Sequence, residues 1–322
     1  MTFLKVNDLQ VEFRVDKKMI KPIEGVSFEM QKGEILGMVG ETGSGKSLTA
    51  HAIVGLSTLA GGVIGGSIEF EDRDLLSLSE KEMQAIRGGQ IAFIPQNPMT
   101  SLDPVYRVGD QIIEALRQHV KISARKAKQQ VIEVMARLNI PNPERVFQQY
   151  PHQLSGGLKQ RIVIAIGVCT NPKLLVADEP TTALDVTVQA QIMRLFKEMT
   201  VERGISLFLI THDLGVIAQV CDKVAVMYAG NMVEFGSIEG LFNTPRHPYT
   251  KALLGCIPTI GMAKGSLSAI YGNVPSSGIY PSGCRYHPRC QYAGKQCKEV
   301  MPPFIEVEDG IWVACYKYYG KK

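Results

Sequence analysis

The chain has no hydrophobic run long enough to cross a bilayer. Its longest apolar stretches, RIVIAIGVC at 161–169 and ISLFLI at 205–210, fall well short of the roughly 18 to 20 residues that a spanning helix needs. The N-terminal MTFLKVNDLQ also lacks the basic segment followed by an apolar core that marks a signal peptide. We therefore expect a protein that stays in the cytosol, where cysteines are normally reduced.

An excess of one charge is also missing. The formal net charge is +4 over 322 residues, and the Lys and Arg residues are scattered along the chain, which gives little support to nucleic-acid binding. Aromatic residues are modest at 7%, while 45% hydrophobic and 20% charged residues are typical of a globular protein of one large or two ordinary domains. We predict no nucleic-acid partner.

A phosphate-binding loop is predicted in GEILGMVGETGSGKS, residues 33–47. An apolar strand leads into the pattern G-x-x-x-x-G-K-[ST], and a helix-compatible segment follows, which disfavours an ordinary glycine-rich turn. Glycines leave backbone amides free to surround phosphate oxygens, and Lys46 is expected to reach the β- and γ-phosphates while Ser47 binds Mg²⁺. The residues assigned to nucleotide binding here are Gly40, Gly43, Ser44, Gly45, Lys46, Ser47 and Leu48.

Two further apolar runs end in polar residues suited to nucleotide hydrolysis. In KLLVADEP, Asp178 is predicted to hold the Mg²⁺ shell and Glu179 to polarise the attacking water. In ISLFLITHD, His212 is predicted to lie on the same sheet edge and to contact the γ-phosphate or that water. A lone histidine would otherwise be read as structural.

The segment LSGGLKQR adds a second phosphate-binding surface. Its Ser155, Gly156 and Gly157 place a hydroxyl and bare amides at the start of a predicted helix. The segment resembles the signature of ATP-binding cassette proteins, and GETGSGKS, VADEP, ALD and THD follow the order of that family. The resemblance covers roughly residues 1–240; Leu158 departs from the commonest signature, at a variable position.

The family resemblance implies a head-to-tail pair of ATPase subunits with two ATP molecules between them. Ser155, Gly156 and Gly157 would then contact the nucleotide held by the partner, and Asp185 would lie at the seam. Gln96 in FIPQNP would reach Mg²⁺ and the water, while its loop contacts a membrane partner; a turn residue is the alternative. Phe13 stands where the family has an aromatic that stacks on adenine, although a core-facing strand residue fits equally.

The periodicities predict an α/β fold, with a P-loop NTPase (RecA-like) core. Short alternating runs in 1–30 and 60–75 indicate an antiparallel β subdomain. Apolar residues at three- and four-residue spacing indicate helices in a subdomain inserted at about 97–165. Strands that alternate with a helix in 174–235 indicate a mostly parallel sheet. We expect a nucleotide-binding domain at 1–240 and a small metal-binding extension at 241–322.

The extension contains four clustered cysteines, with five, six and seventeen residues between them. Four thiols in a reducing compartment favour a metal site over disulfides, but the spacing matches neither a zinc ribbon nor a ferredoxin run and leaves zinc and iron–sulfur open. Cys169, Cys221 and Cys256 are read as core residues. The four predicted ligands are Cys284, Cys290, Cys297 and Cys315.

The phrases HPYTKALLGCIP, NPMTSLDP and GCRYHPRC resemble the dipeptide, oligopeptide and nickel permease branch of the family. Some members of that branch hold a 4Fe-4S cluster, so the resemblance favours the cluster over Zn²⁺. Because the tail is short and its apolar content is thin, we expect the cluster to stabilise its fold and ATP binding by the core to be independent of it. It implies a peripheral subunit on the cytoplasmic face of the membrane that uses ATP and Mg²⁺ to energise uptake of dipeptides or oligopeptides.

The partners that the resemblance implies are a second ATPase subunit, related or identical, two transmembrane permease subunits and, indirectly, an extracytoplasmic substrate-binding protein. The alternatives are an ATPase for nickel or another small solute, a soluble cassette protein with no transport role, and a cassette that binds ATP only as a scaffold. The presence of Glu179 and His212 disfavours the scaffold.

Overall fold

The computed structural model describes residues 2–182, 184–257 and 270–320. The chain divides into two compact units. The first comprises residues 1–31, 35–76 and 211–322, and the second comprises residues 32–34 and 77–210. None of the described helices has both the length and the apolar character that a membrane span requires.

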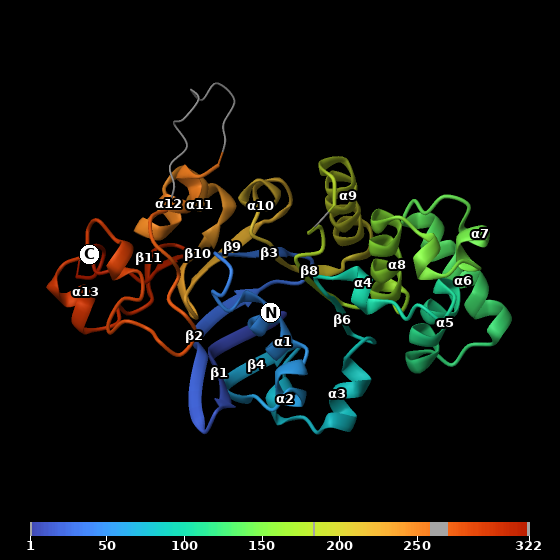
Figure 1. The fold of residues 1–322 in the computed structure, drawn as a ribbon, viewed down its shortest axis with the longest axis horizontal. Coiled ribbons are helices and arrows are strands. Elements are labelled where there is room, and N and C mark those ends of the chain that lie inside the picture. Colours follow the sequence, from blue (N-terminus) through green and yellow to red (C-terminus); the bar gives the residue numbers. More distant parts are fainter. Residues whose placement is uncertain (1, 183, 258–269, 321–322) are drawn as a thin grey trace. The chain divides into compact units, whose positions relative to one another are not determined.

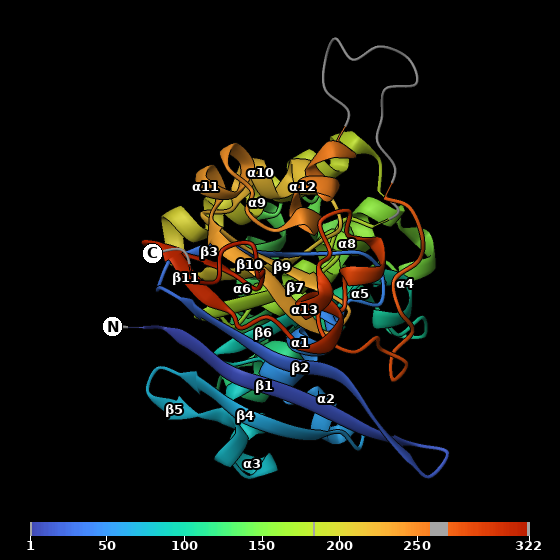
Figure 2. The same ribbon diagram turned by 90° about the vertical axis from the view of Figure 1, so that its left-hand side faces the viewer.

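The first unit contains the predicted antiparallel sheet, in the order β2 (Lys18–Met30), β1 (Leu4–Val15), β4 (Val63–Phe70) and β5 (Arg73–Asp74). The two long strands β1 and β2 run side by side in Figure 2. Leu4, Val6, Leu9 and Val11 of β1 are all buried, because a register shift between Val6 and Leu9 returns the apolar residues to the core face. The prediction of a β subdomain in 1–30 and 60–75 is confirmed.

The same unit contains five strands of a second sheet, in the order β11 (Ile305–Glu308), β12 (Ile311–Val313), β10 (Asn231–Ser237), β9 (Lys223–Tyr228) and β3 (Ile35–Val39). Strand β3 pairs with β9 in parallel and is buried along its length, as its apolar sequence requires. Strands β11 and β12 come from the cysteine-containing tail and extend this sheet next to β10. The tail is therefore anchored by strand pairing as well as by side chains.

Helices of the first unit are short. They are α1 (Lys46–Ile53), α2 (Leu56–Leu59), α10 (Leu214–Val220), α11 (Ile238–Asn243), α12 (Pro248–Gly255) and α13 (Lys295–Glu299). Helix α1 directly follows the glycine-rich loop after β3, so the strand–loop–helix order predicted for 33–54 is confirmed.

The second unit combines three parallel strands with the predicted helices. Strands β6 (Ile91–Ile94) and β8 (Ser206–Ile210) flank β7 (Leu174–Asp178). The helices are α3 (Glu80–Ile86), α4 (Pro98–Ser101), α5 (Val108–His119), α6 (Ala124–Arg137), α7 (Pro143–Phe147), α8 (Gly156–Val168) and α9 (Val186–Arg203). Figure 1 shows α5, α6 and α8 grouped together, so the helices predicted in this stretch are present. A separate helical subdomain with bounds near 97–165 stays a prediction.

Candidate functional site

The glycine-rich loop of the first unit has the backbone that its sequence predicts. Gly45 adopts a φ of 103° at the start of α1, and Gly40 adopts a φ of 155°. A Cβ atom on Gly40 would lie 2.2 Å from the carbonyl oxygen of Met227 and 2.8 Å from the Ser44 hydroxyl. The loop is packed so closely that only glycine fits at position 40.

Polar groups of this loop point inward. The Lys46 ammonium donates to the carbonyl oxygens of Gly40 at 2.8 Å and Glu41 at 3.1 Å, and its side chain is almost fully buried. The Ser44 hydroxyl is fully buried, and none of the described residues is its hydrogen-bond partner. A buried hydroxyl without a partner among the described residues, together with a buried lysine at a helix N-terminus, fits a phosphate ligand.

Two other predicted residues belong to the first unit. His212 is exposed and lies between Thr211, whose amide donates to the Met38 carbonyl of β3 at 3.2 Å, and Asp213, which caps α10. Phe13 of β1 is half-buried, and a Cβ on Gly62 would lie 2.9 Å from its ring. The ring thus keeps one accessible part while its edge packs against the loop before β4.

The second unit brings Gln96 and Glu179 together. They follow the neighbouring parallel strands β6 and β7, whose ends meet at one sheet edge. The Gln96 amide donates to Glu179 Oε2 at 2.9 Å, and the Thr182 hydroxyl donates to the same oxygen at 3.0 Å. Asp178 precedes them at the end of β7 and is only 3% exposed. Asp178, which was predicted to hold the Mg²⁺ shell, Glu179, which was predicted to polarise the attacking water, and Gln96 thus lie at one sheet edge.

The serine–glycine segment and Asp185 also meet in the second unit. Ser155 caps α8 by accepting from the Leu158 amide at 3.4 Å, and Asp185 caps α9 by accepting from the Val188 amide at 2.9 Å. A Cβ on Gly157 would lie 3.1 Å from the Val188 side chain. Two helix N-termini therefore lie next to each other, with Ser155 and Gly156 exposed.

The four tail cysteines line one cavity of about 410 Å³ together with His287. The Cys284 amide donates to the Cys297 carbonyl at 2.8 Å. Burial raises the pKa of the Cys284 thiol to about 11, and burial also raises the pKa of Cys290 and Cys315. The cysteines converge on a shared space, as the sequence predicted.

The part of the chain that the structure describes contains no formed metal-ion site. Among residues 2–182, 184–257 and 270–320, no three His, Cys, Asp or Glu side chains are arranged as ligands of one ion. The metal-binding role predicted for the tail cysteines is therefore not supported by the described residues, although all four side chains line one cavity. Of the other cysteines, Cys169 and Cys221 are buried as predicted and Cys256 is half-buried.

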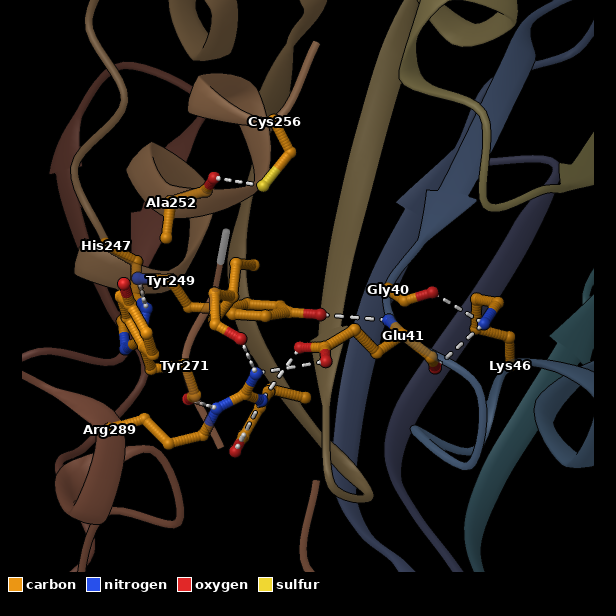
Figure 3. Close-up of polar contacts among 11 residues, drawn as sticks. Gly40, Glu41, Lys46, His247, Tyr249, Ala252, Cys256, Tyr271 and Arg289 are labelled. Atoms are coloured by element: carbon orange, nitrogen blue, oxygen red, sulfur yellow. Dashed lines mark hydrogen bonds and ion pairs between the residues drawn. The ribbon is translucent and has the colours of Figure 1, made fainter. Parts of the chain in front are cut away.

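Sequence reasoning missed three residues at the glycine-rich loop. The Glu41 amide donates to the Tyr249 hydroxyl at 2.9 Å, and both Glu41 carboxylate oxygens accept from Arg289, at 2.9 and 3.1 Å. Figure 3 shows Tyr249 and Arg289 reaching Glu41, and Lys46 bonded to the same loop. The three residues lie in the segments GETGSGKS, HPYTK and GCRYHPRC, each of which carries a motif of its own. No spacing rule links positions so far apart in the sequence.

Family comparisons match two successive parts of the chain. The ABC transporter family matches residues 23–182, and the oligopeptide/dipeptide transporter C-terminal region matches residues 233–297. The first match includes the glycine-rich loop, Gln96, the serine–glycine segment and Glu179. The second includes Tyr249, Arg289 and three of the four tail cysteines.

Similar proteins extend over almost the whole chain. The oligopeptide transport ATP-binding protein AppD of Bacillus subtilis is 44% identical over 318 residues, which are 98% of this chain and 97% of AppD. The dipeptide transport ATP-binding protein DppD of Escherichia coli is 42% identical over 316 residues, again 98% and 97%.

Solved structures show the same cassette fold. CbiO1 from Clostridium perfringens, part of the ABC transporter complex cbiONQ, is 27% identical with a TM-score of 0.64, covering 76% of this chain and 91% of that chain. The cassette MJ0796, a dimer in a post-hydrolysis state bound to ADP and Pi, is 24% identical with a TM-score of 0.67, covering 73% and 99%.

Proposed function

Because the chain belongs to the ATP-binding cassette family, in its branch of oligopeptide and dipeptide transport ATP-binding proteins, we propose that it is the ATP-hydrolysing subunit of a peptide importer. One observation carries this assignment: the cassette is followed by the peptide-transporter C-terminal region, and the similarity to AppD runs through both. In this proposal residues 1–240 form the nucleotide-binding domain and residues 241–322 form the extension.

The first unit holds the triphosphate. The amides of Gly43 and Gly45 and the buried Ser44 hydroxyl would bind phosphate oxygens, and Lys46 would exchange its bonds to loop carbonyls for bonds to the β- and γ-phosphates. Ser47 would ligate Mg²⁺, which would neutralise charge on the phosphates. Within the second unit, Asp178 and Gln96 are the residues that would hold Mg²⁺. Leu48 continues the helix behind the loop, Phe13 stacks on the adenine, and His212 contacts the γ-phosphate.

The second unit supplies the base. Glu179 takes a proton from the attacking water, and the bonds from Gln96 and Thr182 hold its carboxylate in place. Ser155, Gly156, Gly157 and Asp185 form the surface that contacts ATP held by a second ATPase subunit, either a related chain or another copy. Loss of the γ-phosphate removes that contact and opens the pair.

The loop after Gln96 is a suitable docking surface for a permease subunit. Its side chains Met99, Val105 and Tyr106 are 60%, 70% and 60% exposed, an unusual concentration of apolar surface. A groove of about 610 Å³ beside them is lined by Asp103, Tyr106, Gln111, Glu114, Ala115, Gln118 and Ile166. We place two transmembrane permease subunits against this surface of two ATPase subunits, which puts the chain on the cytoplasmic face of the membrane.

Peptide uptake in the host tests this function. Deleting the gene should abolish uptake of a radiolabelled tripeptide, and the wild-type chain should restore uptake where a Glu179→Gln variant does not. Uptake of radioactive nickel and co-purification of the chain with membrane proteins are measured in the same strains. If the deletion abolished nickel uptake but not peptide uptake, the transported solute would be nickel. If uptake of both solutes stayed normal and no membrane protein co-purified, the chain would be a cassette protein without a transport role.

We further propose that the tail cysteines hold a 4Fe-4S cluster. A zinc ion bound by four thiolates brings their sulfurs to within roughly 4 Å of each other, whereas a cluster accepts ligands spread around a larger cavity. The cavity of about 410 Å³ and the raised pKa of Cys284, Cys290 and Cys315 suit thiols that lose protons only when they ligate. The cluster would staple the tail.

Metal analysis of anaerobically purified protein checks the cluster. We expect a broad visible absorption band and about four irons per chain, with little zinc. Cys290→Ser should lose the band and the iron, and the matched control Cys256→Ser, a thiol outside the cavity whose sulfur lies 3.3 Å from the Ala252 carbonyl, should retain both. One zinc per chain and no band would favour a zinc site.

A further inference from the structure

We infer that Arg289 and Tyr249 of the C-terminal extension are positioning residues for ATP binding, acting through Glu41 of the glycine-rich loop. This inference rests on the proposed function only in that the loop at 40–47 binds the phosphates. It adds a task for the extension: the extension holds the phosphate-binding loop in its binding conformation.

Each polar group of Glu41 is used. Its amide donates to the Tyr249 hydroxyl, and its carboxylate accepts two bonds from the Arg289 guanidinium. Its carbonyl oxygen accepts from the Lys46 ammonium and from the Ser44 amide, both at 3.1 Å. Fixing Glu41 from the extension therefore fixes the peptide that touches Lys46 and Ser44, both assigned to phosphate binding.

Arg289 is held rigidly on its own side. Besides Glu41, its guanidinium donates to the Tyr228 hydroxyl at 3.2 Å and to the carbonyl oxygens of Tyr271 at 2.9 Å and Ile270 at 3.3 Å. The side chain is 6% exposed, whereas the Glu41 side chain is 29% exposed. A planar, bidentate ion pair between a buried arginine and a carboxylate is among the stronger and more directional ion pairs.

Tyr249 is equally fixed. Its ring packs against Tyr228 and Tyr286, with ring centroids 4.6 and 5.3 Å away, and it is fully buried. Its amide donates to His247 Nδ1 at 3.0 Å, and the His247 amide donates to the buried Glu234 carboxylate at 2.8 Å. The hydroxyl that accepts from Glu41 thus projects from a helix start that β10 anchors.

Loss of these bonds should weaken ATP binding more than catalysis. A loop free to rotate at Glu41 must be ordered by the nucleotide, so part of the binding free energy is spent on ordering. Once ATP is bound, its phosphates hold the loop, and the catalytic edge after β6 and β7 is untouched. We therefore expect a higher KM and Kd for ATP with little change in kcat.

Because of these contacts, we expect the affinity for ATP to depend on the cysteine region, contrary to the expectation from the sequence that the two are independent. Arg289 directly precedes Cys290, so a change that unfolds the cysteine region also removes the guanidinium from Glu41. Cys290→Ala should therefore raise the Kd for ATP by as much as loss of Arg289 does.

The test measures ATP affinity in the full chain. Arg289→Met, which keeps the length but removes the charge and the bonds, should raise the Kd for ATP about tenfold, and Tyr249→Phe, which removes one hydroxyl, about threefold. The kcat at saturating ATP should stay within about twofold of the wild-type value. In a Glu41→Gln background, Arg289→Met should add less than about twofold.

Two controls keep the outcome clear. Arg246→Met breaks the ion pair of Arg246 with Glu308, which lies within the extension and does not involve the loop, and should leave the Kd for ATP unchanged. Lys46→Ala should abolish ATP binding. An unchanged Kd in Arg289→Met and Tyr249→Phe, with binding lost in Lys46→Ala, overturns this inference alone; wild-type binding in Lys46→Ala overturns the proposed function itself. Equal effects of Arg246→Met and Arg289→Met would show general destabilisation and also overturn the inference.

Discussion

Replacing Glu179 with glutamine is expected to lower the kcat for ATP hydrolysis about 100-fold or more and to leave ATP binding intact. The amide keeps the shape of the carboxylate and an oxygen that can accept from Gln96 and Thr182. It does not take up the proton of the attacking water. The loss therefore falls on the chemical step.

The measurement is steady-state ATP hydrolysis by the assembled ATPase pair, with ATP affinity determined separately. Glu198→Gln is the matched control: it makes the same change on α9 of the same unit, where Glu198 forms an exposed pair with Arg194. This control should hydrolyse ATP at the wild-type rate. A Glu179→Gln variant that keeps more than about a third of the wild-type kcat would rule out Glu179 as the base.

The regular elements were predictable because their patterns are local. In 108–119, Val108, Ile112 and Leu116 recur at four-residue spacing, and all three are buried along α5. The alternation in LKVNDLQVEF likewise yields β1, with its apolar residues on one buried face. Each pattern is complete within a few turns or one strand, so a single sequence is sufficient.

The candidate site was predictable where sheet geometry brings its parts together. Gln96 and Glu179 are 83 positions apart, yet both follow apolar strands, and parallel neighbours place such residues at one edge. No comparable rule joins Glu41 to Arg289 across 248 positions. Their meeting depends on how α12 and the cysteine region pack beside β9 and β10, which is a property of the tertiary fold.

The tail likewise has features that the sequence predicts and features that only the tertiary fold shows. Spacing alone matched neither common cysteine motif, and it left the choice of metal open. The fold brings Cys284, Cys290, Cys297 and Cys315 around one cavity, and it anchors the tail by pairing β12 with β10. Strand pairing therefore anchors the part of the tail at 305–313, whereas the segment with Cys284, Cys290 and Cys297 has no such pairing among the described strands.

Replacing Ser155 with arginine is expected to abolish ATP-driven pairing of the subunits and to lower hydrolysis about 100-fold, with the Kd of each separate subunit for ATP unchanged within about twofold. Ser155 is exposed at the start of α8 and, in our proposal, contacts ATP held by the partner. A long side chain there would fill the space that the partner's nucleotide needs. The chain's own phosphate-binding loop is not altered, so nucleotide affinity should survive.

Size-exclusion chromatography of the Glu179→Gln protein with ATP measures pairing, because blocked hydrolysis should let the closed pair accumulate. Ser123→Arg is the matched control, since Ser123 is exposed, caps α6 in the same unit and loses a bond of the same kind to the Lys126 amide. Both changes should cost about 1 kcal/mol of stability through the lost cap, so only a contact with the partner's nucleotide separates them. If the Ser155→Arg protein pairs as readily as the Ser123→Arg protein, Ser155 does not face that nucleotide, and the proposed two-sided contact with ATP is wrong.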